Sequence, residues 1–252
     1  MKIVTWNVNS LNVRLPHVLE FLEQVKPDVL ALQETKQQDK DFPQADIEAA
    51  GYHVVFSGQK PYNGVAIVSR HEISDVIDSI PNFDDPQRRL LAVSIEGVRI
   101  VNVYIPNGQE VDSDKYRYKF RWLHAMRNYL RSEIANHEKL VLLGDYNIAP
   151  ADIDVHDPQR WSGKIMCSEP ERAWFSSMLE MGLIDSIRQL YPDEPMHSWW
   201  DYRMNAYRRK WGIRIDHILA TPAMRPLDGR VCSEFREKER PSDHAPVCVE
   251  FA

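Results

Sequence analysis

The chain has 252 residues, 43 % of them hydrophobic, a length that permits one large domain burying roughly three quarters of its unfolded surface. No repeat, low-complexity tract or Ser/Gly-rich linker marks a boundary, and the apolar runs are far below the ~20 residues of a membrane span, so we expect one soluble domain over residues 1–252. The formal net charge of −6 argues at first against a nucleic-acid partner, because attraction to phosphate is the main non-specific term in such binding.

The amino terminus and the cysteines indicate the compartment. The amino terminus opens on an apolar run without a charged leader or a cleavage site, so we expect a cytoplasmic protein. Cys167, Cys232 and Cys248 are odd in number and widely spaced, which fits neither a disulfide framework nor a zinc ribbon. We expect them to be reduced structural thiols.

Hydrophobic periodicity predicts a mixed α/β layered domain. Helices are expected over an apolar stripe at 15–25, from about Lys115 to Asn136, and after Ser168, which suits a helix cap. Strands are expected at residues 2–7, 28–33, 52–57, 64–69, 90–95, 98–104, 139–145, 214–220, 229–236 and 246–251. The polar stretch from Pro150 to Cys167 has no clear period and is long enough to predict a functional loop.

Polar side chains follow several of these apolar strands at the point where each strand ends. Asn7 ends the first run, Glu34 follows residues 29–32, and Asp145 and Asn147 follow residues 140–143. Side chains two residues apart in an extended chain point the same way, so one of the pair Asp145 and Asn147 can activate a water while the other orients it. Glu34 follows a nearly continuous apolar run, where a carboxylate is costly unless it binds a cation. Mg²⁺ fits best, with Mn²⁺ as the alternative, because it takes oxygen ligands and few protein carboxylates.

A carboxylate and an imidazole lie side by side near the carboxyl end. Asp243 and His244 stand between Pro241 and Pro246, which stiffen the backbone. Asp216 lies in an apolar strand, where it can hold His244 in one tautomer. Taken singly, such residues are more often turns, salt bridges or caps. Together they have no common structural explanation, whereas one metal-dependent phosphoester site explains them all.

Two segments mix cations with aromatic residues, a mixture that can grip phosphate and stack on bases. They are residues 115–122 and 203–211, and the second includes Arg203. The alternative is that both are the solvated faces of amphipathic helices.

The ordered motifs of the chain resemble those of exonuclease III, the bacterial branch of the exonuclease, endonuclease and phosphatase superfamily, which includes apurinic/apyrimidinic endonucleases. The resemblance covers residues 2–251. It rests on the motifs TWNVN at 5–9, LQETK at 32–36, NVYIPNG at 102–108, GDYNI at 144–148, SWWDYR at 198–203, RID at 214–216 and SDHAP at 242–246.

The resemblance implies a four-layered α/β sandwich, two packed mixed sheets flanked by helices, and a residue-by-residue assignment of the site. Glu34 is then the principal metal ligand beside Asn7 and Asp243. Asp145 and Asn147 activate and orient water, and Asp216 and His244 act on the scissile phosphate. The remaining implied contacts are with phosphate (Tyr104 and Asn107) and with a base-less deoxyribose (Trp199, Ile213 and Ile215).

The resemblance further implies single-step hydrolysis of double-stranded DNA at abasic sites and 3′ termini by a monomer that needs no membrane. Three alternatives stay open: a phosphatase of the same superfamily acting on a small or lipid phosphoester, a non-enzymatic nucleic-acid-binding relative, and a partner-binding scaffold. Met166 lies where the irregular loop enters the third helix. It is either a pocket wall that restricts an extruded sugar or a gap-filler in the core.

Overall fold

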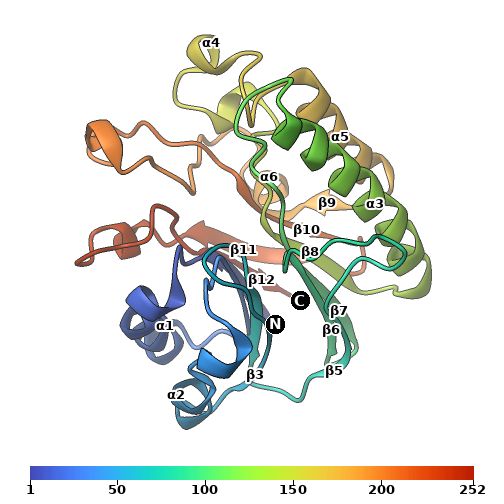
Figure 1. Cartoon of the computed structure of the whole chain (residues 1–252), viewed down its shortest axis with the longest axis vertical. Coiled ribbons are helices and arrows are strands. Elements are labelled where there is room, and N and C mark those ends of the chain that lie inside the picture. The colour runs from blue at the N-terminus through green and yellow to red at the C-terminus, as the bar shows by residue number, and fades with distance from the viewer.

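The computed structural model describes residues 1–252 in four layers, with two six-stranded sheets packed between two layers of helices (Figure 1). The first sheet has the order β11-β12-β1-β2-β4-β3, and its strands are β1 (Lys2–Asn7), β2 (Val29–Gln33), β3 (His53–Ser57), β4 (Val65–Ser69), β11 (Pro226–Val231) and β12 (Val247–Phe251). The second sheet has the order β5-β6-β7-β8-β10-β9, and its strands are β5 (Ser74–Ile77), β6 (Leu90–Ile95), β7 (Val98–Tyr104), β8 (Leu140–Asp145), β9 (Ile184–Asp185) and β10 (Asp216–Ala220). The four-layered sandwich implied by the sequence is confirmed.

The helices follow from the apolar stripes in the sequence. They are α1 (Leu11–Val25), α2 (Gln44–Ala49), α3 (Asp114–Asn136), α4 (Pro158–Trp161), α5 (Glu169–Glu180) and α6 (Ser186–Leu190), with short 3₁₀ turns at η1 (Asp39–Asp41), η2 (Asp152–Asp154), η3 (Arg203–Asn205) and η4 (Ser233–Arg236). Ser168 caps α5 as expected, because its hydroxyl accepts a hydrogen bond from the backbone N–H of Glu171.

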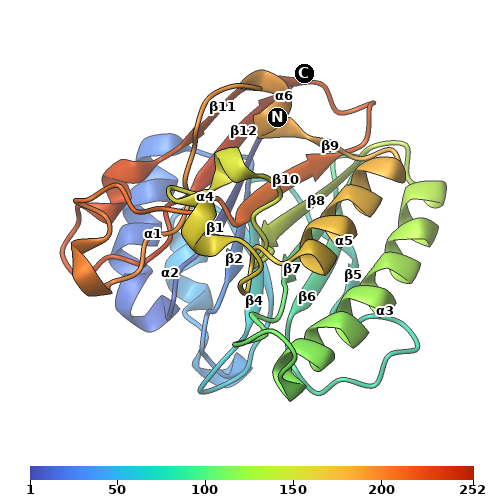
Figure 2. The same cartoon turned by 90° about the horizontal axis from the view of Figure 1, so that it is seen from above.

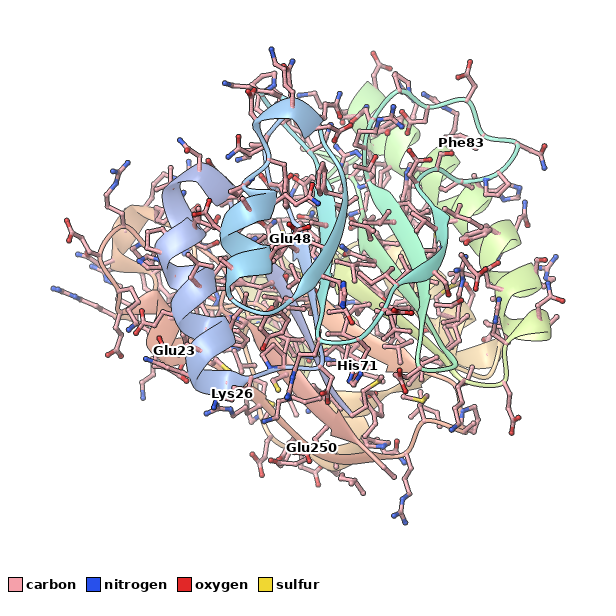
Figure 3. All side chains as sticks on the ribbon, turned by 90° about the horizontal axis from the view of Figure 1, so that it is seen from below. Glu23, Lys26, Glu48, His71, Phe83 and Glu250 are labelled. Atoms are coloured by element: carbon pink, nitrogen blue, oxygen red, sulfur yellow. The ribbon has the colours of Figure 1, made fainter.

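Three apolar clusters hold the layers together. One fills the space between the sheets, where inward-facing residues such as Ile3 and Leu143 meet. A second packs α1 and α2 on the outer face of the first sheet, and a third packs α3 and α5 on the outer face of the second (Figure 2). Seen from below, Glu23 and Glu48 mark the α1 and α2 side and Phe83 the α3 side (Figure 3). Burial of this kind contributes about 25 cal/mol per Å² of apolar surface.

Strand register brings the polar strand ends to one edge of the sandwich. Each sheet has one parallel pair, β1 with β2 and β7 with β8, and the other pairs are antiparallel. Tyr104 pairs with Asp145, which in turn pairs with Asp216, so these three residues lie at one level across adjacent strands. Asn7 pairs with Gln33, the residue before Glu34.

Most strand boundaries agree with those expected from the sequence, and the differences have physical causes. The strand expected at 229–236 ends at Val231 and is followed by η4, because Phe235 turns to pack against Trp6 and Phe21. The strand expected from 214 begins at Asp216. β5 and β9 were not expected: β5 is a largely exposed edge strand without an apolar run, and β9 has only two residues.

No helix combines the length and the hydropathy that crossing a membrane requires. The three cysteines are buried and free, as the sequence predicted.

Candidate active site

Gly144 lets β8 come close to β7 immediately before the site. Its φ is +145°, and a Cβ added there would lie 1.9 Å from the carbonyl oxygen of Val103, so only glycine fits. Three residues further on, Asn147 adopts a left-handed backbone with φ +50°. Its backbone N–H donates to Asp145 Oδ1 at 2.9 Å. The GDYN segment therefore fixes the direction of the Asp145 carboxylate.

Asn7 joins the carboxylates of the two sheets. Its Nδ2 donates to Glu34 Oε1 at 2.8 Å and to Asp145 Oδ2 at 2.9 Å, and all three side chains come from different strand ends. Burial raises the pKa of Asp145 to about 7, although the nearby His244 opposes the shift. A carboxylate with this pKa is suited to accept a proton near neutral pH.

His244 lies between two carboxylates. Its Nδ1 is 2.8 Å from Asp216 Oδ2, and its Nε2 is 3.8 Å from Asp145 Oδ2. Asp216 is itself held in place, since Ser198 Oγ accepts the backbone N–H groups of Ile215 and Asp216. Burial alone would lower the pKa of His244, but the charges of Asp216 and Asp145 outweigh it and raise the pKa to about 10. The imidazole is therefore positively charged at neutral pH.

The Ser242–His244 segment is attached to the end of β1. Ser242 Oγ donates to the carbonyl of Asn7 at 2.7 Å, and Trp6 Nε1 donates to the carbonyl of His244 at 3.3 Å. Trp199 Nε1 donates to Asp243 Oδ2 at 2.9 Å, so the tryptophan expected to line the sugar pocket borders the acidic cluster.

Glu34 is balanced by a cation that the sequence interpretation did not assign. Lys36 Nζ lies 2.8 Å from Glu34 Oε2 and also donates to Asn9 Oδ1. Burial favours a raised pKa for Glu34, but Lys36 and Asn7 outweigh it and hold the pKa below its usual range. Tyr104 is neighbour to this carboxylate, and burial together with the Glu34 charge raises the pKa of its phenol well above its ordinary value. Tyr104 is thus a neutral hydrogen-bond donor.

The side chains around Glu34 fit a hard divalent cation. Glu34, Asp243 and Asn7 all carry oxygen donors, the type that Mg²⁺ prefers. Asn7 turns its amide nitrogen toward Glu34 in this structure, and its Oδ1 accepts the backbone N–H of Asn9. Asp145, Asp216 and His244 also bring potential ligand atoms within 4.8 Å of one another, and Asp216 Oδ1 is buried without a hydrogen-bond partner. The acidic cluster as a whole can hold a metal.

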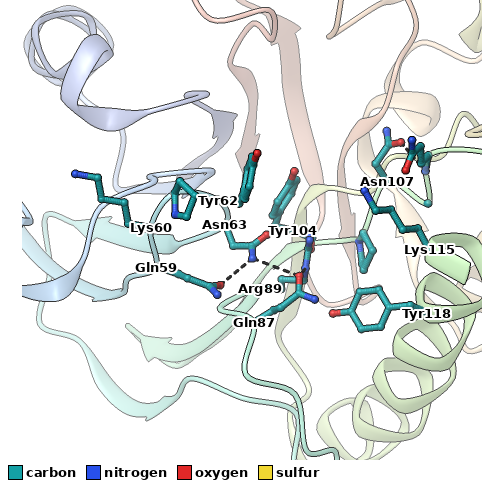
Figure 4. Close-up of a pocket in the computed structure, with 14 residues that line it drawn as sticks. Gln59, Lys60, Tyr62, Asn63, Gln87, Arg89, Tyr104, Asn107, Lys115 and Tyr118 are labelled. Carbon is teal, nitrogen blue, oxygen red and sulfur yellow. Dashed lines mark hydrogen bonds between the residues drawn. The ribbon is translucent and has the colours of Figure 1, made fainter.

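Tyr104 and Asn107 open onto a polar pocket beside the cluster. The pocket has a volume of about 600 Å³, and its charged lining residues are Lys60, Arg89 and Lys115 (Figure 4). The guanidinium of Arg89 lies 4.6 Å from the centre of the Tyr104 ring. Cations without a carboxylate among them make this pocket suitable for phosphate groups.

The residues expected to receive a base-less sugar are packed together. Met166 is 7 % exposed, Ile213 0 % and Ile215 1 %, and all belong to one small apolar cluster against which Trp199 packs. Met166 has a left-handed backbone with φ +69°, and its carbonyl accepts the backbone N–H of Ala149. In this structure the side chain of Met166 occupies the apolar space beside Trp199.

The two segments that mix cations with aromatic residues differ in place. Within 115–122, Tyr116, Lys119 and Trp122 are buried on the inner face of α3, whereas Lys115 and Tyr118 line the 600 Å³ pocket. Arg203 is exposed and paired with Asp201 at 2.6 Å, and with Trp199 it lines a second open pocket of about 390 Å³. The structure brings together the expected catalytic and metal residues. Arg203 does not join them and lies at the exposed 390 Å³ pocket instead.

Comparisons with known proteins decide the family. The model of the endonuclease/exonuclease/phosphatase family matches residues 4–244. The chain is 35 % identical to exodeoxyribonuclease III of Haemophilus influenzae, over 100 % of both chains. It belongs to this family, in the branch of exonuclease III and the AP endonucleases.

Solved structures of the same family share the whole fold. A 3′ phosphatase from Neisseria, bound to a product DNA hairpin, is 53 % identical with a TM-score of 0.99, covering 100 % of this chain and 99 % of that one. An AP endonuclease from Archaeoglobus fulgidus is 40 % identical with a TM-score of 0.96 at the same coverage. The family therefore includes both 3′-processing and abasic-site enzymes with this architecture.

Proposed function

We propose that this protein is a DNA repair nuclease that hydrolyses phosphoester bonds at 3′ termini and at abasic sites of double-stranded DNA. The observation that carries the proposal is the convergence of Asp145, Asn7, Glu34 and His244, from both sheets, on one buried acidic cluster with hydrogen bonds of 2.8–2.9 Å through Asn7. Similarity to a DNA-bound 3′ phosphatase and to an AP endonuclease supports the substrate.

The proposed reaction is a single displacement by water. Asp145 accepts the proton of the water, and Asn147, whose N–H is bonded to Asp145, orients it for in-line attack. The charged imidazole of His244, held by Asp216, stabilises the negative charge that develops on the phosphate oxygens. Tyr104 and Asn107 hold the phosphate from the side of the 600 Å³ pocket.

Glu34, with Asn7 and Asp243, would hold Mg²⁺, which supplies charge neutralisation for the phosphate and the leaving oxygen. We propose that the protein acts as a monomer, because the whole cluster is built from one chain.

The proposal is tested by incubating one preparation with three matched duplexes that carry an abasic site, a recessed 3′ hydroxyl or a 3′ phosphate. Gel analysis should show hydrolysis of at least the two 3′ substrates, and Asp145→Asn should lose every activity in parallel. A preparation that leaves all three duplexes intact in the presence of Mg²⁺ and Mn²⁺ contradicts the proposal.

A further inference from the structure

A lysine is fully buried behind the active site. Lys119 lies on α3 in the same stripe as Tyr116 and Met126, and its side chain is 0 % exposed. Its counter-ion is Glu171 on α5, whose side chain is also 0 % exposed. Replacing a buried ion pair by apolar residues is often neutral or stabilising, so stability alone gives a weak reason for this pair.

The ammonium group of Lys119 also binds two backbone carbonyls of the active site. Nζ donates to the carbonyl of Asn147 at 2.9 Å and to that of Asn107 at 3.3 Å. These residues follow β8 and β7, and their side chains are joined because Asn107 Nδ2 donates to Asn147 Oδ1 at 2.8 Å. One cation therefore connects the two loops that present the amides to the substrate.

The carboxylate of Glu171 extends this connection to a third loop, the one that leads from β8 into α5. Its Oε2 accepts the backbone N–H of Ser168 at 3.1 Å and the Ser168 hydroxyl at 2.6 Å. Ser168 Oγ is also 2.7 Å from the hydroxyl of Tyr116 on α3. The loop that ends in Met166 is thereby anchored to the same ion pair.

Asn147 needs such support because of its own conformation. Its backbone is left-handed at φ +50°, and its Nδ2 is already bonded to the carbonyl of Ile105 at 3.0 Å. Both polar atoms of the Asn147 side chain are therefore hydrogen-bonded. The backbone carbonyl of Asn147 is a further point of attachment, and Lys119 binds it. A shift of about 1 Å in a positioning group can cost ~100-fold in rate.

We propose that Lys119 is a positioning residue, whose ammonium holds the carbonyls of Asn147 and Asn107 so that the Asn147 amide faces the reacting water. The proposal rests on the hydrolytic function proposed above. Glu171 is the counter-ion that makes burial of the cation possible.

Two single substitutions break the same ion pair but differ in what they leave. Glu171→Gln keeps Lys119 and its two carbonyl contacts, and glutamine retains the helix cap. Lys119→Met removes the carbonyl contacts, and the double variant Lys119→Met/Glu171→Gln removes them without leaving a buried unpaired carboxylate. Steady-state hydrolysis of a duplex with a 3′ phosphate and urea unfolding are measured for all of them.

We expect kcat of Lys119→Met and of the double variant to fall ~10- to 100-fold, while KM stays within about threefold. We expect the double variant to recover most of the unfolding free energy lost in Lys119→Met, without recovering kcat, and Glu171→Gln to keep kcat within about threefold of the wild type. A double variant with wild-type kcat, or equal loss of kcat in Glu171→Gln and Lys119→Met, would overturn the proposal.

A readout that does not require turnover separates this proposal from the proposed function. The side-chain NH₂ signals of Asn147 in the ¹⁵N-correlated NMR spectrum should shift in Lys119→Met and in the double variant but stay near their wild-type positions in Glu171→Gln. Unchanged Asn147 signals in all variants contradict the positioning role, whereas an inactive wild type contradicts only the function.

Discussion

Each reacting group in the acidic cluster is set by its immediate neighbours. Asp145 is buried and its pKa is raised, whereas Glu34 is only half-buried and its pKa is lowered. The difference is that Lys36 Nζ lies 2.8 Å from Glu34, while Asp145 has Asp216 and Glu34 as further acidic neighbours. Two similar carboxylates are thus prepared for different tasks, one to accept a proton and one to stay charged.

Removing the base or the imidazole should separate binding from catalysis. Asp145→Asn and His244→Ala leave the surrounding binding groups in place, so both should bind duplex DNA with a 3′ phosphate yet hydrolyse it at least ~100-fold more slowly. Single-turnover rates and fluorescence anisotropy check this. His124→Ala, an exposed change on α3, is the control and should behave as wild type. Near-normal turnover in either active-site variant would place the chemistry elsewhere.

The rate should depend on pH through the same two groups. Asp145 must be deprotonated to act as a base, and its pKa is raised to about 7, so the rate should rise as pH increases through that value. His244 must stay protonated, and its pKa of about 10 predicts a fall in rate above that pH. Measuring kcat from pH 5.5 to 10.5 checks both limbs. A rate that is flat between pH 5.5 and 8 is inconsistent with Asp145 as the base.

At the scale of elements, the loop between β8 and α5 places Met166 beside the residues expected to receive a sugar. It carries η2 and α4, the latter labelled in Figure 1, and near its end Met166 packs in the small apolar cluster with Ile213, against which Trp199 also packs. Asp154 at the end of η2 is buried and paired with Arg214 at 2.7 Å, which fixes the loop to the second sheet. The loop is therefore attached to the second sheet on one side and packs Met166 into the apolar cluster on the other.

Met166→Gly should change substrate choice. Glycine opens the space filled by Met166 and suits the left-handed backbone at φ +69°. Access should improve more for an extruded internal sugar than for a terminal nucleotide, which needs less displacement from the duplex. The ratio of abasic incision to 3′ exonuclease activity on matched duplexes should rise. Met166→Leu keeps the bulk and is the control, and an unchanged ratio in folded Met166→Gly would leave Met166 as packing.

At the scale of the whole molecule, two buried histidines link stability to pH. Burial, together with nearby positive charge, lowers the pKa of His217 and His197 from 6.5 to about 4. The unfolded chain then binds more protons than the folded chain between pH 6.5 and 4. The stabilisation is complete above pH 6.5 and is lost as pH falls toward 4. Urea unfolding at pH 7.5 and 5 should show this loss. His197→Phe should lose less unfolding free energy than the wild type between pH 7.5 and 5. An equal loss in the two proteins would contradict the assignment to His197.

Much of the fold and site was predictable because strands of apolar residues ended in polar ones. That pattern located Asn7, Glu34 and Asp145. Parallel pairing of β1 with β2 explains why Asn7 and Glu34 meet, and packing of the two sheets brings Asp145 of β8 to Asn7. The full set of layers and the role of Tyr104 needed the family resemblance. The metal and substrate contacts assigned to single residues remain predictions.

Other features depend on tertiary contacts that no local pattern carries. Asn102 of β7 donates to the carbonyls of Leu32 and Ala66 at 3.0 Å, which bridges the sheets inside the core. The ion pair between Lys36 and Glu34 could be recognised only once the backbone was known. Lys119 did leave a signal, since it interrupts the apolar stripe of α3 at a position three or four residues from Tyr116 and Leu123.

The central claim, that the ends of both sheets form one metal-assisted hydrolytic site, is tested most directly by metal removal. Hydrolysis of a 5′-labelled duplex with a 3′ phosphate is measured in excess EDTA and again after Mg²⁺ is added back. The Asp145→Asn variant controls for contaminating nuclease, and circular dichroism controls for folding. The account predicts that activity vanishes in EDTA, returns with Mg²⁺ and is absent from Asp145→Asn, while the spectrum stays unchanged because the core is apolar. Undiminished hydrolysis in excess EDTA by the wild type would contradict it.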